Sequence, residues 1–195
     1  FMQMGVDILN SDDVNGLAAY LKALPHTTFQ NDSFHPVYTP AQPEAWTSIT
    51  PKNIILMIGD GMGLTQLYSA YTANQGTLNI FKIKDVGFSI TTAADSEITD
   101  SAAGATAMAS GQKTNNRHVG VDAEGAALIP LTARLKQVGY HTAVISNGDV
   151  TDATPAAFYA HNTERSASEA IALDLLDSDL DILIGGGTKS FTHRS

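Results

Sequence analysis

A glycine-rich turn around Asp60 is the first place in this sequence where residue types and spacing could support chemistry. The turn, residues 59–63, directly follows the apolar run 54–58. Glycines let the backbone bend and let other groups approach closely, and a carboxylate at such a point can offer oxygen ligands to a hard cation. The alternative is that Asp60 caps the helix that follows. A dinucleotide-binding loop is excluded, because Leu64 stands where that fingerprint requires its third glycine.

A serine at the start of an alanine-rich stretch is the second candidate. Ser101 follows Asp100 within the segment 99–107, whose other residues are mostly small. At a helix N-terminus, unpaired N–H groups and the helix dipole stabilise both an alkoxide and an incoming phosphate. A serine hydroxyl is a weak nucleophile until a histidine or a metal ion activates it, and no histidine stands near Ser101 in the sequence. The alternative is that Asp100 or Ser101 only caps the helix.

A third segment combines oxygen ligands with a cationic side chain. Pro155 favours the first turn of a helix, with Asp152 and Thr154 presented just before it. A carboxylate and a hydroxyl two residues apart can share one Mg²⁺, which prefers octahedral oxygen coordination. Arg165 follows further along, and its planar guanidinium can bind phosphate with two N–H groups. The alternative is an N-capped helix with a solvated arginine, and His161 is expected to support that helix.

Strand-like and helix-like patterns alternate around these segments. Continuous apolar runs of strand length are typical of strands buried in a parallel sheet, and capped, apolar-periodic stretches predict helices. The predicted strands are 54–58, 86–92, 141–145 and 181–184, and the predicted helices include 101–110, 128–138 and 167–176. This order predicts an α/β layered fold, in which ligands bind beyond the carboxyl ends of the strands.

Composition excludes several classes of protein. Lys and Arg total 11 against 20 Asp and Glu, which gives a net charge of −9, and no clustered basic face that could bind nucleic acid is visible. The absence of cysteine excludes disulfides, cysteine-ligated zinc and thiol nucleophiles. No apolar run approaches the ~18 residues that a membrane-spanning helix requires. Residues 1–50 differ from the rest, because a short amphipathic helix and a proline-containing loop predict an N-terminal arm.

Taken together, the three segments resemble the alkaline phosphatase family. The resemblance is carried by residues 53–63, 99–106 and 152–157, followed by Arg165. Residues 120–122 and 185–189 are also similar in sequence to the family. They occur in the family's order and spacing, and three motifs in register are far more specific than any one of them. The resemblance extends over 52–195 and implies a three-layer αβα fold with a mostly parallel central sheet, incomplete in this chain.

The resemblance also implies a role for each candidate residue. Asp60 would bridge a catalytic zinc and a neighbouring Mg²⁺, and Ser101 would be the nucleophile that becomes a phosphoserine. Asp152 and Thr154 would complete this chain's share of the Mg²⁺ site, and Arg165 would bind two phosphate oxygens. Some branches of the family have a histidine where Asp152 stands. The aspartate favours Mg²⁺ over a third zinc, because a carboxylate oxygen is a harder ligand than an imidazole.

The resemblance implies a metal-dependent phosphate monoester hydrolase that is periplasmic or secreted, and a homodimer is the assembly to expect from it. The family completes its two zinc sites with residues from later in the chain, so we expect 51–195 to be the N-terminal part of a catalytic domain that is inactive in isolation. Residues 1–50 would be an arm with a short helix. Two alternatives remain: a catalytically inactive module that binds metal or phosphate on the same fold, and a phosphodiesterase of the same superfamily.

Overall fold

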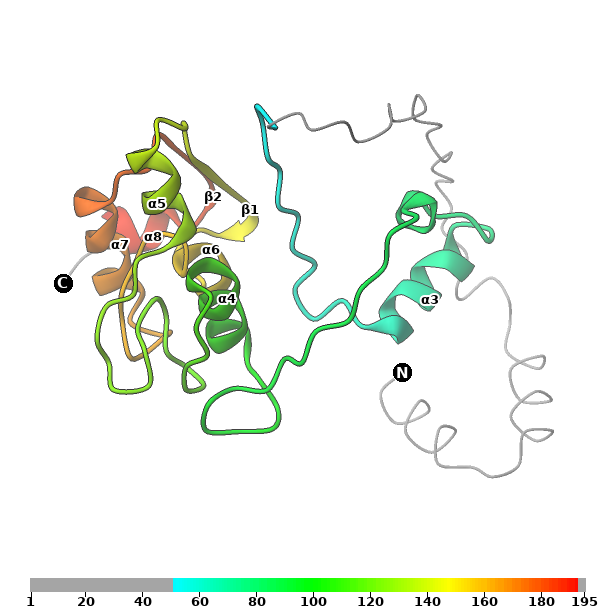
Figure 1. The fold of residues 1–195 in the computed structure, drawn as a ribbon, viewed down its shortest axis with the longest axis horizontal. Coiled ribbons are helices and arrows are strands. Elements are labelled where there is room, and N and C mark those ends of the chain that lie inside the picture. The colour runs from blue at the N-terminus through cyan, green and yellow to red at the C-terminus, as the bar shows by residue number, and fades with distance from the viewer. Residues whose placement is uncertain (1–50, 193–195) are drawn as a thin grey trace. The chain divides into compact units, whose positions relative to one another are not determined.

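The computed structural model describes residues 51–192 of the 195-residue chain (Figure 1). The chain divides into two compact units, Phe1–Gly87 and Phe88–Ser195, each of which is described by itself. The arm predicted at residues 1–50, with its short helix, lies outside the described residues.

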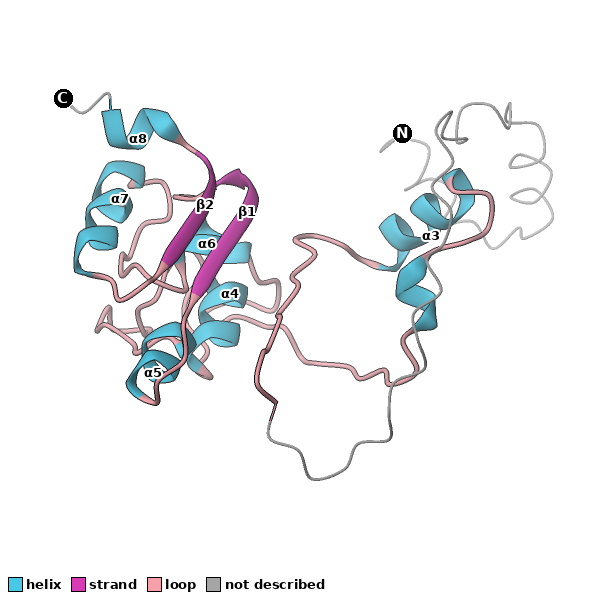
Figure 2. Cartoon of the chain, turned by 90° about the horizontal axis from the view of Figure 1, so that it is seen from above, coloured by secondary structure: helices cyan, strands magenta, loops and turns pink. Residues whose placement is uncertain are grey.

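The second unit contains a parallel pair of strands with helices between and around them. Its helices are α4 (Ser101–Ser110), α5 (Leu131–Gln137), α6 (Ala153–Ala156), α7 (Ser168–Asp177) and α8 (Thr188–Thr192), and its strands are β1 (Ala143–Asp149) and β2 (Ile182–Gly186). Val144 pairs with Leu183 in the parallel register of β1 and β2 (Figure 2). Because α6 and α7 connect the two strands, the chain forms the crossover that parallel strands need. The predicted α/β class is confirmed.

Helix α4 begins and ends where its sequence predicts. Asp100 precedes it in an extended conformation, and its side chain accepts a hydrogen bond from the Ala103 N–H. Gly111 ends the helix in the left-handed conformation, with a φ of 79°, which costs a glycine little. Helix α5 is shorter than predicted and begins at Leu131, because Pro130 adopts an extended ψ of 158° at its N-terminal end.

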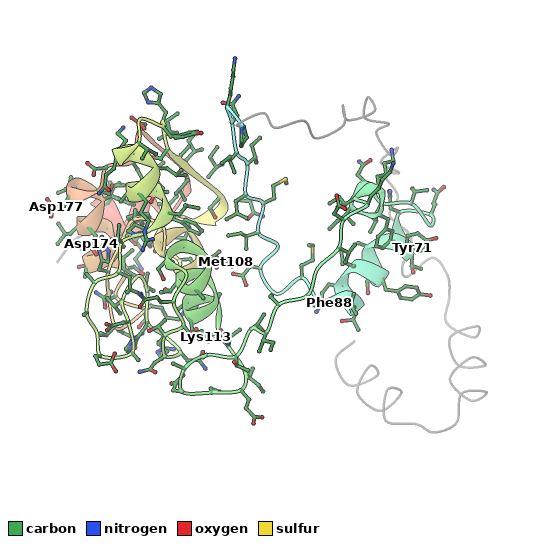
Figure 3. All side chains as sticks on the ribbon, in the orientation of Figure 1. Tyr71, Phe88, Met108, Lys113, Asp174 and Asp177 are labelled. Carbon is green, nitrogen blue, oxygen red and sulfur yellow. The ribbon has the colours of Figure 1, made fainter. Side chains whose placement is uncertain are left out.

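The described part of the first unit contains the glycine turn, which is followed by helix α3 (Leu64–Ala73) and the short 3₁₀ helix η2 (Asn79–Lys82). The Met62 N–H donates to the Gly59 carbonyl over 3.2 Å and closes the turn, and Gly61 has a φ of 62° that favours glycine. Tyr71 of α3, labelled in Figure 3, packs on Phe81 of η2 with ring centroids 5.4 Å apart.

Two predicted strands, 54–58 and 86–92, have no ladder partner among the described residues. Their apolar side chains are exposed, including Ile55 at 86%, Met57 at 89% and Phe88 at 98%. The prediction of paired strands is therefore wrong for the residues that the structure describes. The physical reason is that an apolar run favours an extended backbone, but a β-strand forms only when a neighbouring strand supplies backbone hydrogen bonds.

Small side chains let α4 and α6 pack closely in the second unit. The buried residues of α4 are Ala102, Ala103, Ala105, Thr106 and Ala109, and those of α6 are Ala153 and Ala156. Because alanines present little bulk, the two helices can pack closely, and Figures 1 and 2 both show them adjacent. This packing brings the residues that precede α4 toward those that precede α6.

Two glycines of the second unit share a left-handed backbone conformation but differ in how closely other atoms approach them. Gly120 has a φ of +62°, and a Cβ there would lie 2.0 Å from the Ala160 carbonyl oxygen. Gly111 has a φ of +79°, but a Cβ there would meet nothing within 4 Å. We expect Gly111→Ala to cost about 1–2 kcal/mol from the left-handed conformation alone. Gly120→Ala should cost a further ~1–3 kcal/mol, because backbone must move.

Urea unfolding of the two glycine variants measures the difference directly. Equal unfolding midpoints for Gly111→Ala and Gly120→Ala would show that the contact between Gly120 and Ala160 is looser than the structure has it.

Candidate active site

Ser101 is the first residue of α4, so its hydroxyl lies at the N-terminal end of a ten-residue helix. Asp100 holds this end in place, since its Oδ1 accepts from the Ala103 N–H over 2.9 Å. Its own N–H donates to Asn116 Oδ1 over 2.7 Å. The unpaired N–H groups of such a helix end favour negative charge. The local structure around Ser101 is therefore suited to an alkoxide or a phosphate.

The second oxygen of Asp100 links α4 to two other parts of the chain. Asp100 Oδ2 accepts from Arg165 Nη1 over 3.2 Å and from the Arg117 N–H over 3.0 Å. Partial burial works against ionisation of this carboxyl, but hydrogen bonds from Ala103, Arg165 and Arg117 outweigh it and lower the pKa of Asp100 below its ordinary value. Asp100 is therefore an anion at neutral pH that holds Arg165 beside Ser101.

Arg165 joins the second and third segments of the sequence. While Nη1 contacts Asp100, Nη2 donates to Asp152 Oδ1 over 3.1 Å. The Arg165 side chain is 24% exposed, so the guanidinium is largely surrounded by protein. Because an arginine carries five N–H donors, one contact to each carboxylate leaves N–H groups of both terminal nitrogens for a further anion.

Asp152 caps α6 and contacts Arg165 with the same oxygen. Its Oδ1 accepts from the Ala153 N–H over 2.8 Å as well as from Arg165, so the other carboxylate oxygen can accept a cation. Thr154 lies within α6, two residues further on. A carboxylate and a hydroxyl are hard oxygen donors, which fit Mg²⁺ better than zinc. These two residues are a partial donor set only, and no cluster of three or more His, Cys, Asp or Glu able to hold a metal occurs within residues 51–192.

The structure thus brings four of the five predicted site residues into one unit. Ser101, Asp152, Thr154 and Arg165 all belong to the second unit, and Arg165 connects the helix ends that carry the other three. Asp60 belongs to the first unit, in the turn that precedes α3. Its place relative to Ser101 stays a prediction.

Three residues that support the contacts of Arg165 were not predicted from the sequence. Asn116 and Arg117 hold Asp100 through its N–H and its Oδ2, and Glu164 binds the Arg117 guanidinium. Arg117 and Glu164 are 47 positions apart, so no local pattern could pair them.

Both histidines near the site are bound to backbone groups. His118 Nδ1 lies 2.9 Å from the Asp122 carbonyl oxygen. His161 Nε2 lies 2.8 Å from the Leu128 carbonyl oxygen, and the His161 N–H donates to Asp174 of α7, labelled in Figure 3. Their ring nitrogens therefore bind loop backbone. The contacts of His161 go to Leu128 and to α7, so the support of α6 predicted for His161 stays a prediction.

A comparison with protein families and with known proteins gives a consistent result. The family model described as alkaline phosphatase matches residues 51–195. The chain is 36% identical over 159 residues to alkaline phosphatase 4 of Bacillus subtilis, covering 73% of this chain and 34% of that protein. It is 32% identical over 173 residues to the alkaline phosphatase of Escherichia coli K12, covering 74% of this chain and 37% of that protein. The chain therefore spans about a third of the length of these curated relatives.

Solved structures resemble the chain in the same region. The alkaline phosphatase of the Antarctic bacterium TAB5 superposes with a TM-score of 0.73 at 42% identity, covering 75% of this chain and 43% of that one. A histidine-to-aspartate variant of that enzyme, with Mg bound in its M3 site, superposes with the same TM-score and identity and covers 42% of its own chain. Within the described residues, no helix has the length and apolar character needed to cross a membrane.

Replacing Asp100 with asparagine should lower the free energy of unfolding by an amount that depends on pH. Since the pKa of Asp100 is lower when folded than its ordinary 3.8, the ionised carboxylate stabilises the fold above that pH and loses its effect as pH falls through the folded value. Asp100→Asn should therefore cost roughly 1 kcal/mol at neutral pH, and less as the pH drops below about 4. Urea unfolding of both proteins from pH 7 to pH 3 measures the difference, and a gap that does not narrow in acid would contradict the role given to this charge.

Proposed function

The chain belongs to the alkaline phosphatase family, and from that premise we propose that the protein hydrolyses phosphate monoesters through a phosphoserine formed at Ser101. The observation that carries the proposal is the position of Arg165, held between Asp100 and Asp152 beside the first residue of α4. A planar cation next to a serine at a helix N-terminus is an arrangement that suits a phosphate group and a nucleophile acting on it.

The proposed chemistry consists of two displacements at phosphorus. The Ser101 hydroxyl loses its proton, and its oxygen attacks phosphorus while the bond to the ester oxygen breaks; the departing alkoxide takes up a proton. Water then attacks the phosphoserine, releases inorganic phosphate and restores the serine hydroxyl. The N–H groups at the start of α4 stabilise negative charge on the serine oxygen. Two inversions would leave the configuration at phosphorus unchanged.

Arg165 would bind two oxygens of the phosphate with N–H groups that do not contact the carboxylates. Because Asp100 and Asp152 hold the guanidinium before the substrate arrives, little side-chain freedom is lost on binding. The same two carboxylates offset part of the positive charge, so the affinity of the site for substrate and product phosphate alike is lower than at an unpaired arginine. Arg165 would therefore act mainly on the affinity for phosphate.

We infer that the full site contains Mg²⁺ and two zinc ions. When bound, such ions lower the pKa of a coordinated hydroxyl and neutralise charge that develops on the attacking and leaving oxygens. Asp152 and Thr154 would hold the Mg²⁺, as the presence of Mg in the aspartate variant of the Antarctic enzyme supports, and Asp60 would bridge the Mg²⁺ and one zinc. The remaining zinc ligands would come from residues other than 51–192, which contain no sufficient cluster.

The proposal extends to the organisation of the protein. We propose that 51–195 is the N-terminal part of the catalytic domain, that 1–50 is an arm, and that this portion alone turns over little substrate because its metal sites are incomplete. A periplasmic or secreted location and a homodimer are further proposals that follow from membership of the family.

Replacing Ser101 with alanine tests the nucleophile. In the full-length protein with Zn²⁺ and Mg²⁺, Ser101→Ala should lower kcat for p-nitrophenyl phosphate by roughly 10³-fold or more, because the covalent route is lost. Ser110 at the other end of α4 is the matched control, since its hydroxyl donates to the Thr106 carbonyl over 2.7 Å and accepts from the Gln112 N–H over 3.2 Å, both local contacts at the C-terminal end of the helix. Ser110→Ala should keep nearly full activity.

The opposite outcome would favour the alternative. If the metal-loaded protein binds phosphate but shows no turnover that depends on Ser101, the chain is part of a binding module, whereas turnover of phosphodiesters in preference to monoesters would indicate a phosphodiesterase.

Two further substitutions separate phosphate binding from metal binding. Arg165→Ala should raise KM about 10-fold or more with a smaller loss in kcat, since it removes contacts made to the phosphate in ground and transition state alike. Asp60→Ala should lose bound metal and kcat together, as measured by metal content and steady-state kinetics. Small and equal effects of both substitutions would argue against the proposed site.

A further inference from the structure

The loop that carries Arg165 is tied to the loop after α4 by a pair of charged side chains that the proposed mechanism does not use. Arg117 donates from Nε to Glu164 Oε2 over 2.9 Å and from Nη2 to Glu164 Oε1. The contact is bidentate, so it fixes the relative orientation of the two groups as well as their distance. Glu164 directly precedes Arg165 in the sequence.

Arg117 also contacts the other partner of Arg165. Its backbone N–H donates to Asp100 Oδ2, the same oxygen that accepts from Arg165 Nη1. The contacts therefore close a ring: the Arg117 backbone binds Asp100, Asp100 binds Arg165, Arg165 is bonded to Glu164, and Glu164 binds the Arg117 side chain. A closed ring restrains the Arg165 guanidinium from its tip and from its backbone at once.

Both sides of the ring are anchored locally. Glu164 Oε1 accepts from the Ser166 N–H over 2.9 Å and from the Ser166 hydroxyl over 2.6 Å, which orients the carboxylate. Val119 and Asn162 exchange two backbone hydrogen bonds of 2.8 Å and hold the two loops side by side. Arg117 has a φ of 72°, a conformation that an arginine adopts only when its surroundings impose it.

The pair is too exposed to matter chiefly for stability. The side chains of Arg117 and Glu164 are 54% and 43% exposed, and exposed ion pairs contribute little to folding. Contact with Glu164 raises the pKa of Arg117 and lowers that of Glu164, so both stay ionised at neutral pH. Their geometry must then serve something other than the core.

We propose that Arg117 and Glu164 form a positioning pair that sets the orientation of Arg165 and thereby the affinity of the site for phosphate. This inference rests on the proposed function for its kinetic consequence, and on geometry alone for its effect on phosphate binding. Neither residue touches the substrate in this account; both act through Arg165.

Two conservative substitutions separate positioning from simple charge. Arg117→Lys keeps the charge but loses the planar fork, and Glu164→Gln keeps the shape but loses the negative charge. If the pair positions Arg165, both should raise KM for p-nitrophenyl phosphate and the Kd of inorganic phosphate by about 5–10-fold, with kcat within about twofold. If only charge mattered, Arg117→Lys would change nothing and Glu164→Gln would tighten phosphate binding, because it removes an anion next to the site.

The double variant and a control complete the experiment. Since the two residues act as one unit, the double variant should bind phosphate no more weakly than the single variant with the larger loss of affinity. Lys136→Gln, which breaks the partly exposed pair between Lys136 of α5 and Asp181 just before β2, should leave KM and phosphate affinity unchanged. All variants are made in the full-length, metal-loaded protein, and urea unfolding confirms that each one folds.

Calorimetry with inorganic phosphate keeps this inference separate from the proposed function. If the wild type binds phosphate without serine-dependent turnover, and both substitutions weaken that binding, the positioning pair stands while the proposed function fails. If turnover depends on Ser101 but Glu164→Gln binds phosphate as tightly as the wild type or more tightly, the positioning pair is overturned. A wild type that binds no phosphate would overturn both.

Discussion

The guanidinium of Arg165 lies between the carboxylates of Asp100 and Asp152, and the candidate site depends on this contact. It joins the start of α4 to the start of α6, because each carboxylate also caps its own helix. The alanines that line the two helices make the approach possible, since larger side chains would hold the helix ends apart. The close packing of the alanines and the ion pairs of Arg165 with Asp100 and Asp152 therefore depend on each other.

The local chemistry of the sequence was enough to predict the elements whose signals lie within a few residues. Asp100 and Gly111 mark the ends of α4, and the pairing of β1 with β2 follows from apolar runs separated by a helix. The paired strands expected at 54–58 and 86–92 could not be foreseen in this way, because a strand is completed by a neighbour that its own residues do not specify. The link between Arg117 and Glu164 is equally invisible in sequence, since it depends on two loops that the fold alone makes adjacent.

The family motifs predict which side chains carry the chemistry, but not how those side chains are held. Asp100 looked like a helix cap, and it is one, yet its second oxygen binds Arg165 and the Arg117 N–H. Asp152 likewise caps its helix and contacts Arg165, and in the proposed site it is also a ligand to a hard cation. Each carboxylate serves two or three partners, so a substitution at either would disturb a helix end and the phosphate site together. Because the partners of these carboxylates include Arg117, which lies outside the three motifs, the contacts that hold Arg165 extend beyond the motifs.

A crystal structure of the full-length protein with Zn²⁺, Mg²⁺ and inorganic phosphate is the most direct test of the central claim. The account predicts one phosphate bound by both terminal nitrogens of Arg165 and next to the Ser101 hydroxyl, with oxygens of Asp60, Asp152 and Thr154 on the neighbouring cations. A structure in which Asp60 faces a different crevice, or in which phosphate binds away from Ser101 and Arg165, would contradict it.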